Sequence, residues 1–184
     1  LFEDANNNIW ISTDENGVNI YQDRGIVFYD RMAGMTSTRI FSIYKDKDDI
    51  LWMGTGKGLE SFDGQTFTEY ALPKDYEPKY IWDITGLPNG DKLLAMPDYT
   101  LMRFDGETYS SFSEAYGLEE LYVYDLYLDS ENGLWISSGS GLYHINLETK
   151  KVERLSEEDG LPSDEVYYVF EETDGTKWIG TSYG

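Results

Sequence analysis

The side chains that could carry out chemistry in this sequence are of few types. It holds one histidine, His144, no cysteine, and 35 acidic residues against 14 basic ones, for a net charge of −21. The lack of cysteine excludes a disulfide scaffold, a thiolate nucleophile and cysteine-ligated zinc. A single histidine has no second one with which to share a metal, so we interpret His144 as a surface or structural residue.

Adjacent carboxylates are the second candidate for catalysis. They occur at Glu119–Glu120, Glu157–Glu158–Asp159 and Glu171–Glu172. A glycosidase needs two carboxylates at a fixed separation across a cleft. In so acidic a chain such pairs arise from composition alone, and we interpret them as solvated surface. We therefore expect no catalytic residue in this segment.

Three segments rich in Asp, Asn and Ser could be compared with calcium loops, and they begin at Asp4, Asp46 and Asp129. An EF-hand loop needs Gly at its sixth position and a bidentate Glu at its twelfth. The second and third segments have Lys57 and Ser140 at the twelfth position. The first reaches Glu15 there but has Ile9 at the sixth. We expect hairpin turns stabilised by Asx side chains, with no metal and no cofactor.

Composition narrows the choice of partner. A pI near 4.1 gives no electrostatic support for binding nucleic acid or an anionic membrane, whereas neutral polar ligands and cations remain open. With 40% hydrophobic and 16% aromatic residues, the chain is predicted to fold. It has no apolar run of about 18 residues, and it does not begin with Met, so we expect it to be part of a longer protein.

An internal repeat positions these residues. Trp-containing segments recur at 9–13, 51–55, 134–138 and 177–181, and Leu93 takes the Trp place in a fifth copy. The positions 10, 52, 93, 135 and 178 are 42, 41, 42 and 43 residues apart. Such regular recurrence predicts that these tryptophans pack in the core rather than bind sugar.

Each repeat is predicted to form four short strands. The third and fourth are joined by Asp-Gly dipeptides at 63–64 and 105–106, which favour tight hairpins. Four strands in about 42 residues are typical of a β-propeller blade. We predict an all-β propeller of four-stranded antiparallel blades, about four and a half of them, within a larger propeller. The approximate blades are residues 1–37, 38–78, 79–120 and 121–162, with a partial blade at 163–184.

The first strand of the repeat has apolar residues on both faces, which predicts burial between neighbouring blades. Its apolar columns hold Ile40, Ile81, Val123 and Val166, then Phe41, Trp82, Tyr124 and Tyr167, then Ile43, Ile84, Leu126 and Val169. In the third repeat the strand after Leu93 fits better one residue later, so we expect a slip or bulge between Leu93 and Met96.

The predicted ligand site lies where the chain enters these first strands. The entry positions hold Arg39, Tyr80, Tyr122 and Glu165, and Asp83 and Asp125 stand deeper in the strand. The residue type at these positions differs from repeat to repeat, whereas the core columns are apolar in every repeat. A mixed set of Tyr, Arg and acidic side chains is expected of a surface that binds a polar ligand. We expect the turns with Lys57, Tyr99 and Ser140 at the same end. A solvent-filled channel mouth without a ligand is the alternative.

The repeat resembles the two-component regulator propeller repeat. The match is best at 158–166 with Glu171 and Glu172, followed by Asp174–Thr181, and it is good at 51–59. Residues 71–100 match least. The resemblance implies the extracytoplasmic, periplasmic sensor of a membrane-anchored hybrid two-component protein, whose histidine kinase lies elsewhere in the chain. It implies binding of an oligosaccharide or other small polar ligand, and a homodimer in the full-length protein.

Two other functions stay open. Streptogramin-lyase-like propellers have similar repeats, but such chemistry is expected to need a histidine near the channel, and His144 lies on a third strand. An acidic scaffold for a protein partner is the other alternative. We also expect the rest of the propeller to cover the end faces of this segment, which would otherwise self-associate.

Overall fold

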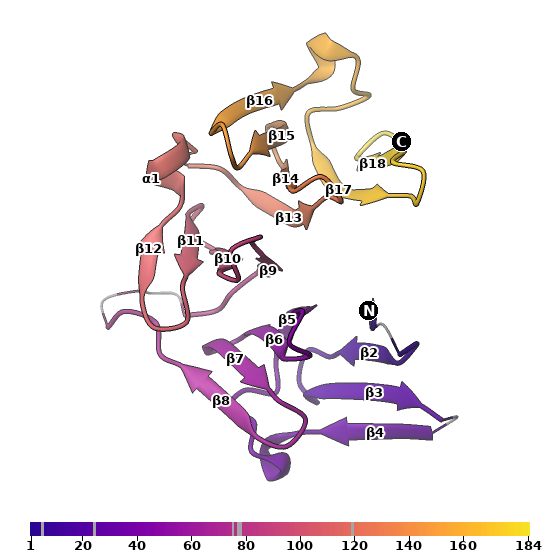
Figure 1. The fold of residues 1–184 in the computed structure, drawn as a ribbon, viewed down its shortest axis with the longest axis vertical. Coiled ribbons are helices and arrows are strands. Elements are labelled where there is room, and N and C mark those ends of the chain that lie inside the picture. The colour runs from indigo at the N-terminus through magenta and orange to yellow at the C-terminus, as the bar shows by residue number, and fades with distance from the viewer. Residues whose placement is uncertain (5, 24, 75, 77–78, 119) are drawn as a thin grey trace. The chain divides into compact units, whose positions relative to one another are not determined.

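The computed structural model of the protein describes residues 1–4, 6–23, 25–74, 76, 79–118 and 120–184. Strands joined by short turns make up most of it, as predicted for an all-β chain (Figure 1). The chain forms two compact units, Leu1–Ile84 and Thr85–Gly184. Among the described residues, no helix is long and apolar enough to cross a membrane.

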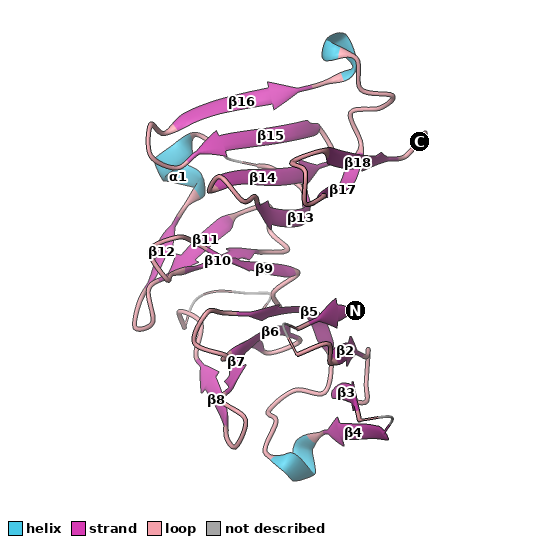
Figure 2. Cartoon of the chain, turned by 45° about the vertical axis from the view of Figure 1, so that its right-hand side comes forward, coloured by secondary structure: helices cyan, strands magenta, loops and turns pink. Residues whose placement is uncertain are grey.

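The first unit contains two four-stranded antiparallel sheets, each in sequential strand order. The first sheet consists of β1 (Phe2–Glu3), β2 (Ile9–Ser12), β3 (Val18–Gln22) and β4 (Gly25–Tyr29). The second consists of β5 (Ile40–Lys45), β6 (Leu51–Thr55), β7 (Gly58–Phe62) and β8 (Phe67–Tyr70). A 3-10 turn, η1 (Arg31–Ala33), follows β4 (Figure 2).

The second unit contains the remaining strands. The third sheet has β9 (Asp83–Gly86), which begins at the unit boundary, with β10 (Lys92–Ala95), β11 (Leu101–Phe104) and β12 (Tyr109–Ser111). The fourth has β13 (Val123–Leu128), β14 (Gly133–Ser138), β15 (Gly141–Asn146) and β16 (Lys151–Leu155), and the fifth has only β17 (Val166–Glu171) and β18 (Lys177–Thr181). Helix α1 (Ser113–Tyr116) follows β12, and η2 (Glu157–Asp159) follows β16.

Packing between consecutive sheets forms the cores of the units. In the first unit, Trp10 and Val18 of the first sheet pack with Leu51 and Met53 of the second. In the second unit one core joins the third and fourth sheets, and another joins Leu142 of the fourth to β17. All residues of β6 and β7 are buried.

A repeated turn fixes the tryptophans. The indole Nε1 of Trp10, Trp52 and Trp135 donates to the carboxylate of Asp4, Asp46 or Asp129, at 3.0, 2.6 and 2.8 Å. In each case the other carboxylate oxygen accepts from the backbone N–H groups two and four residues on, at 2.6–3.0 Å. The predicted Asx turns are therefore present, and each carries its tryptophan.

Electrostatics at these turns favours the ionised carboxylate. Burial opposes ionisation of Asp129, but hydrogen bonds from the Trp135 indole and two backbone N–H groups outweigh it, and the pKa of Asp129 lies below its ordinary value. Hydrogen bonds likewise outweigh burial at Asp4 and lower its pKa. In the third sheet Leu87 and Leu93 stand in place of the acid and the tryptophan, and Leu93 is fully buried.

The slip expected between Leu93 and Met96 is not present. Lys92–Ala95 pairs with β11 in unbroken register, and the irregularity lies in the following turn, where Met96 N–H donates to the Thr100 carbonyl. Tyr99 in that turn has a positive φ of 68°. Register shifts occur instead in three first strands, at Phe41, Tyr124 and Tyr167. Each of these is a bulged residue in the column predicted to be core.

Candidate functional site

The entry positions have a common backbone geometry. The carbonyls of Arg39, Tyr122 and Glu165 each accept a hydrogen bond from the turn that follows the second strand of their own sheet. The donors are the N–H groups of Gly56, Gly139 and Ser182, at 2.9, 3.0 and 3.0 Å. In these three sheets the entry positions and the turns after the second strand therefore lie at the same end, as predicted for the turns with Lys57 and Ser140, and we call this the entry end.

In the first unit, the candidate residues Arg39 and Tyr80 both lie against the ring of Phe41. The Arg39 guanidinium lies 6.0 Å from the centroid of the Phe41 ring, and its Nε bonds the Asp14 carboxylate at 2.7 Å. The Tyr80 ring lies 5.3 Å from Phe41, and the Trp82 ring stacks on Phe41 at 5.8 Å.

Buried Glu60 holds the loop that carries Arg39. This β7 residue is 1% exposed, and its carboxylate accepts from the backbone N–H of Thr36 at 2.7 Å. Burial raises the pKa of Glu60 despite this bond. Asp83 lies at the start of β9 and is partly buried.

In the second unit, four tyrosines form a row across three sheets. The rings of Tyr99 and Tyr122 are 5.4 Å apart, those of Tyr122 and Tyr124 are 4.9 Å apart, and those of Tyr124 and Tyr167 are 5.1 Å apart. Tyr99, Tyr122 and Tyr167 remain 46%, 43% and 42% exposed. The tyrosine row therefore offers several aromatic surfaces to solvent at the entry end.

Glu165 joins the tyrosine row through a hydrogen bond. The Tyr124 hydroxyl donates to Glu165 Oε1 at 2.9 Å. Burial and this bond raise the pKa of Tyr124 to about 12, so the hydroxyl stays protonated and keeps the carboxylate in place. Predicted residues Tyr122 and Glu165 thus meet through a residue that we had placed in the core.

Asp125 is partly buried between two sheets of the second unit. It lies on β13 directly after the bulge and faces β17, where the Val169 N–H approaches its Oδ2 at 3.5 Å. Burial raises the pKa of Asp125 to about 6, and the hydrogen bond from Val169 opposes that rise only in part. A carboxylate kept in this setting is costly to ionise and well suited to accept hydrogen bonds from a ligand.

The column Phe41, Trp82, Tyr124 and Tyr167 is where sequence reasoning about the site was wrong. We predicted it as core, yet Trp82 is 39% exposed and Tyr167 is 42% exposed. A bulge adds one residue to the strand, so the face on which the next residues lie no longer follows strict alternation. The one sequence signal for an exposed binding surface was that all four residues of this column are aromatic.

The other chemical candidates have structural partners. His144 stacks on Trp135 with ring centroids 4.3 Å apart, and its Nδ1 lies 3.8 Å from a Glu153 carboxylate oxygen. Glu171 accepts from Ser130 N–H at 2.8 Å and from Lys177 at 3.1 Å, which ties the fifth sheet to the fourth. Glu119 lies outside the described residues. Among the described residues, no three His, Asp or Glu side chains converge as metal ligands.

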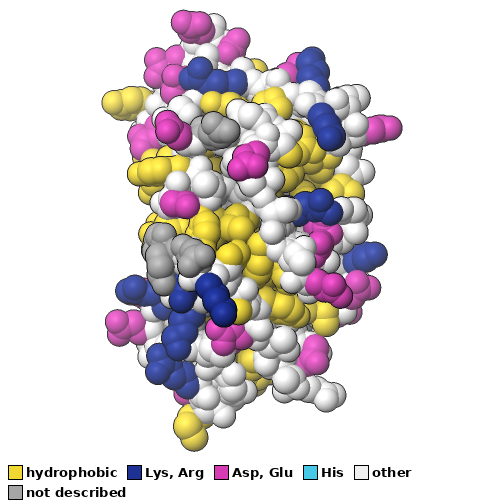
Figure 3. All heavy atoms as spheres, turned by 90° about the vertical axis from the view of Figure 1, so that its left-hand side faces the viewer, with side chains coloured by type: hydrophobic (Ala, Val, Ile, Leu, Met, Phe, Trp, Pro, Cys, Tyr) yellow, Lys and Arg dark blue, Asp and Glu magenta, His cyan; other side chains and the backbone are white. Residues whose placement is uncertain are grey.

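The acidic side chains show no single gathering on the face in Figure 3, where Asp and Glu stand at separate places among Lys and Arg. Some of them form exposed ion pairs, such as Arg154 with Asp164 at 3.4 Å.

Comparison with known families assigns the repeat. A family model described as "Two component regulator propeller" matches residues 34–57 and 117–140. These segments contain the loops that enter β5 and β13, including Arg39 and Tyr122. Two segments of the chain match the two-component regulator propeller repeat. The recognition made from the sequence is thereby confirmed.

A curated protein of Formosa agariphila, "Histidine kinase P4", is 29% identical over 146 residues. That match covers 73% of this chain and only 10% of the kinase. The two-component regulator propeller repeats thus correspond to a small part of that protein.

Solved structures confirm the propeller fold. The extracellular domain of a hybrid two component system from B. thetaiotaomicron superposes with a TM-score of 0.76 at 20% identity, covering 96% of this chain and 25% of that one. Virginiamycin B lyase from Staphylococcus aureus superposes with a TM-score of 0.78 at 17% identity, covering 100% of this chain and 62% of the lyase. At these identities the likeness concerns the fold alone.

Proposed function

We propose that the chain is part of the extracytoplasmic sensor propeller of a hybrid two-component signalling protein, and that it binds an oligosaccharide at its entry end. The observation that carries the proposal is the tyrosine row with Glu165, because it is an exposed aromatic surface built on the repeat that the family model matches. The signalling context is supported by the similarity of the chain to the extracellular domain of a hybrid two component system and to a histidine kinase.

The chemistry of the entry end suits a sugar. Exposed tyrosine faces can pack on the apolar face of a sugar ring, while their hydroxyls and the carboxylates of Glu165 and Asp125 can bond its hydroxyl groups. In the first unit, Tyr80 and Arg39 offer the same combination around Phe41. The proposed ligand-binding residues are Arg39, Tyr80 and Asp83 in the first unit, and Tyr122, Asp125 and Glu165 in the second.

The rest of the propeller is the proposed partner of the two terminal sheets. In the first unit, Ile26 and Phe28 of β4 are exposed on a face of the first sheet. In the second unit, Phe170 and Trp178 face solvent from the fifth sheet, although Trp178 bonds Glu172 at 2.7 Å just as the buried tryptophans bond their aspartates. A further blade on each of these faces would bury them. Dimerisation of the full-length protein is proposed as the route of signalling.

Catalysis is not part of the proposal. The lyase alternative depends on a histidine at the channel, whereas His144 is on β15 and is packed against Trp135. The scaffold alternative differs in its ligand, which would be a protein.

The experiment is calorimetric titration of the intact protein with a panel of glucan, xylan and mannan oligosaccharides. The combined variant Arg39→Ala, Tyr80→Ala, Tyr122→Ala should weaken the binding that is found by at least about tenfold, which is ~1.4 kcal/mol. The control combines Lys47→Ala and Glu107→Ala, two exposed residues in turns at the opposite end of their sheets.

Unchanged affinity in the combined variant would refute the site. If no oligosaccharide bound or raised the melting temperature while a stable protein complex formed, the scaffold function would replace the sensor of small ligands.

A further inference from the structure

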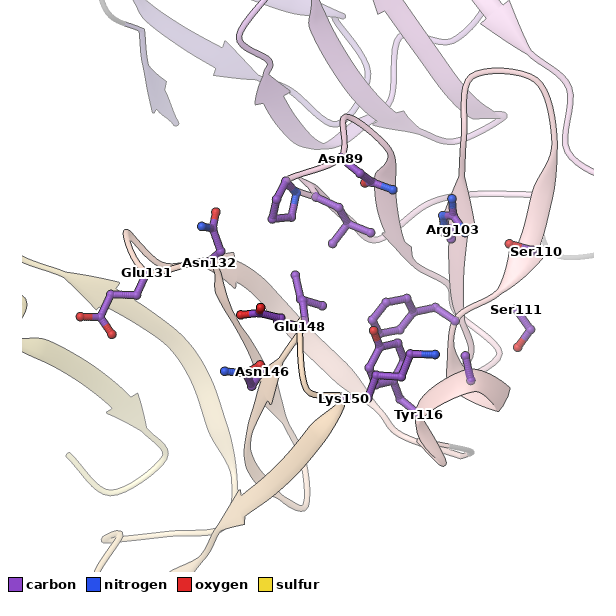
Figure 4. A pocket seen from close by; sticks show the side chains of 15 residues that line it. Asn89, Arg103, Ser110, Ser111, Tyr116, Glu131, Asn132, Asn146, Glu148 and Lys150 are labelled. Carbon is purple, nitrogen blue, oxygen red and sulfur yellow. The ribbon is translucent and has the colours of Figure 1, made fainter.

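A second site lies at the opposite end of the strands in Thr85–Gly184. It is a cavity of about 580 Å³ whose walls come from the β9–β10, β13–β14 and β15–β16 turns, from β11 and β12, and from α1 (Figure 4). Those turns join first to second and third to fourth strands, so they lie away from the entry end. We call this cavity the turn pocket. Its volume is within the range of small-molecule sites.

The irregular third repeat creates the apolar wall of the turn pocket. Leu87 stands where other repeats have the aspartate that bonds a tryptophan, and it packs on the core together with Tyr116 and Leu147. The rings of Phe112 and Tyr116 stack with centroids 4.3 Å apart and an interplanar angle of 20°. A ligand in the turn pocket therefore meets Leu87, Leu147 and Tyr116, with Phe112 buried against Tyr116.

Polar groups are held in place around this wall. Arg103 Nε bonds the Asp91 carboxylate, which also accepts from Asn89 Nδ2 at 2.7 Å. Asn146 Oδ1 accepts from the Thr149 N–H at 2.8 Å and its hydroxyl at 3.0 Å, so the Asn146 Nδ2 group takes no part in these bonds. These bonds fix the side chains before a ligand arrives, which lowers the entropic cost of binding.

The charges of the lining cancel. Arg103 and Lys150 supply two positive charges, and Glu131 and Glu148 supply two negative ones. Figure 4 shows Asn146 and Glu148 on one hairpin, across from Arg103. An anion would find no excess of positive charge here in a chain of net charge −21, and a cation would find no cluster of unopposed carboxylates.

We propose that the turn pocket binds a neutral, polyhydroxylated ring, namely a mono- or disaccharide unit. Its aromatic and leucine wall accepts the apolar face of the ring, while amide, guanidinium, carboxylate and hydroxyl groups bond the hydroxyls. This site is separate from the entry end, and it does not require that the entry end bind oligosaccharide.

The test uses cellobiose, maltose and xylobiose as probes, with saturation-transfer NMR and calorimetry on the intact protein. Ala115→Trp fills the turn pocket from α1, and Glu114→Trp places the same side chain on the neighbouring exposed residue that does not line it. We expect a probe that binds to lose at least about tenfold affinity in the first variant and none in the second.

A second variant keeps the proposal testable if Ala115→Trp disturbs α1. Asn146→Asp retains the oxygen that bonds Thr149 and removes the donating amide group. It should therefore lower the affinity for the probe several-fold without lowering the melting temperature. The combined entry-end variant of Arg39, Tyr80 and Tyr122 should leave this binding unchanged.

The proposal is overturned if none of the three disaccharides shows saturation transfer at millimolar concentration, or if Ala115→Trp leaves the binding intact. Tighter binding of glucuronate than of the neutral sugars would also overturn it. Loss of probe binding in the entry-end variant would also refute the turn pocket, and would assign the sugar to the entry end instead.

Discussion

Replacing Asp125 by Asn should stabilise the protein at neutral pH and not in acid. Burial raises the pKa of Asp125 from an ordinary value of 3.8 to about 6. Below pH ~4 the carboxyl group is protonated in both the folded and the unfolded chain. Between those two pKa values the unfolded chain releases the proton while the folded chain retains it, so the free energy of unfolding falls as the pH rises through this window.

The size of the effect follows from the same two values. One pKa unit corresponds to about 1.4 kcal/mol, so the cost of ionising Asp125 in the folded protein approaches ~3 kcal/mol above pH ~6. Asparagine has nearly the same shape and no charge, so Asp125→Asn should recover much of that amount at pH 7 and almost none at pH 4.

Urea unfolding of wild type and variant from pH 4 to pH 8 measures this difference. Glu107→Gln removes the same charge from an exposed turn and serves as the control for general repulsion in an acidic chain. The reasoning is refuted if the difference between Asp125→Asn and wild type does not change with pH, if it has the opposite sign, or if Glu107→Gln shows the same profile.

Two further predictions concern packing between strands. In a double-mutant cycle, Trp52→Phe and Asp46→Asn should show a coupling of about 1–3 kcal/mol in the free energy of unfolding, because the indole donates to the carboxylate at 2.6 Å; additive effects would contradict this. Gly54→Ala should destabilise the protein by about 1–3 kcal/mol, because a Cβ there would lie 2.8 Å from the Ile81 carbonyl oxygen. An unchanged melting temperature would contradict this, since it would mean that the backbone moves apart without loss of stability.

The regular parts of the fold could be predicted from the sequence because they repeat. Repeat positions 42, 41, 42 and 43 residues apart define the blades, and an Asp or Glu six residues before each second-strand Trp defines the turn. The entry end followed from the same alignment, since equivalent residues must occupy equivalent places. Its backbone geometry is now seen at Arg39, Tyr122 and Glu165.

The tyrosine row could not be predicted, because it depends on the bulges at Tyr124 and Tyr167. Strict alternation assigns each residue of a strand to one face, and an inserted residue ends that rule locally. Buried Glu60 was also missed, since an isolated acid on a strand looks like surface. Its role depends on a loop 24 residues earlier, whose backbone it bonds.

The third repeat departs from the others at two positions, because Leu87 and Leu93 replace the acid and the tryptophan. An aspartate without the indole would be a buried acid short of a donor, and an indole without the aspartate would bury an unpaired N–H. Leu87 and Leu93 avoid both costs only because both positions changed, and Leu87 gains an apolar surface at the end of the strand. That surface is the wall of the turn pocket. The variant Leu87→Asp should therefore destabilise the second unit and abolish binding of a sugar in the turn pocket. The affinity of a ligand at the entry end should be unchanged.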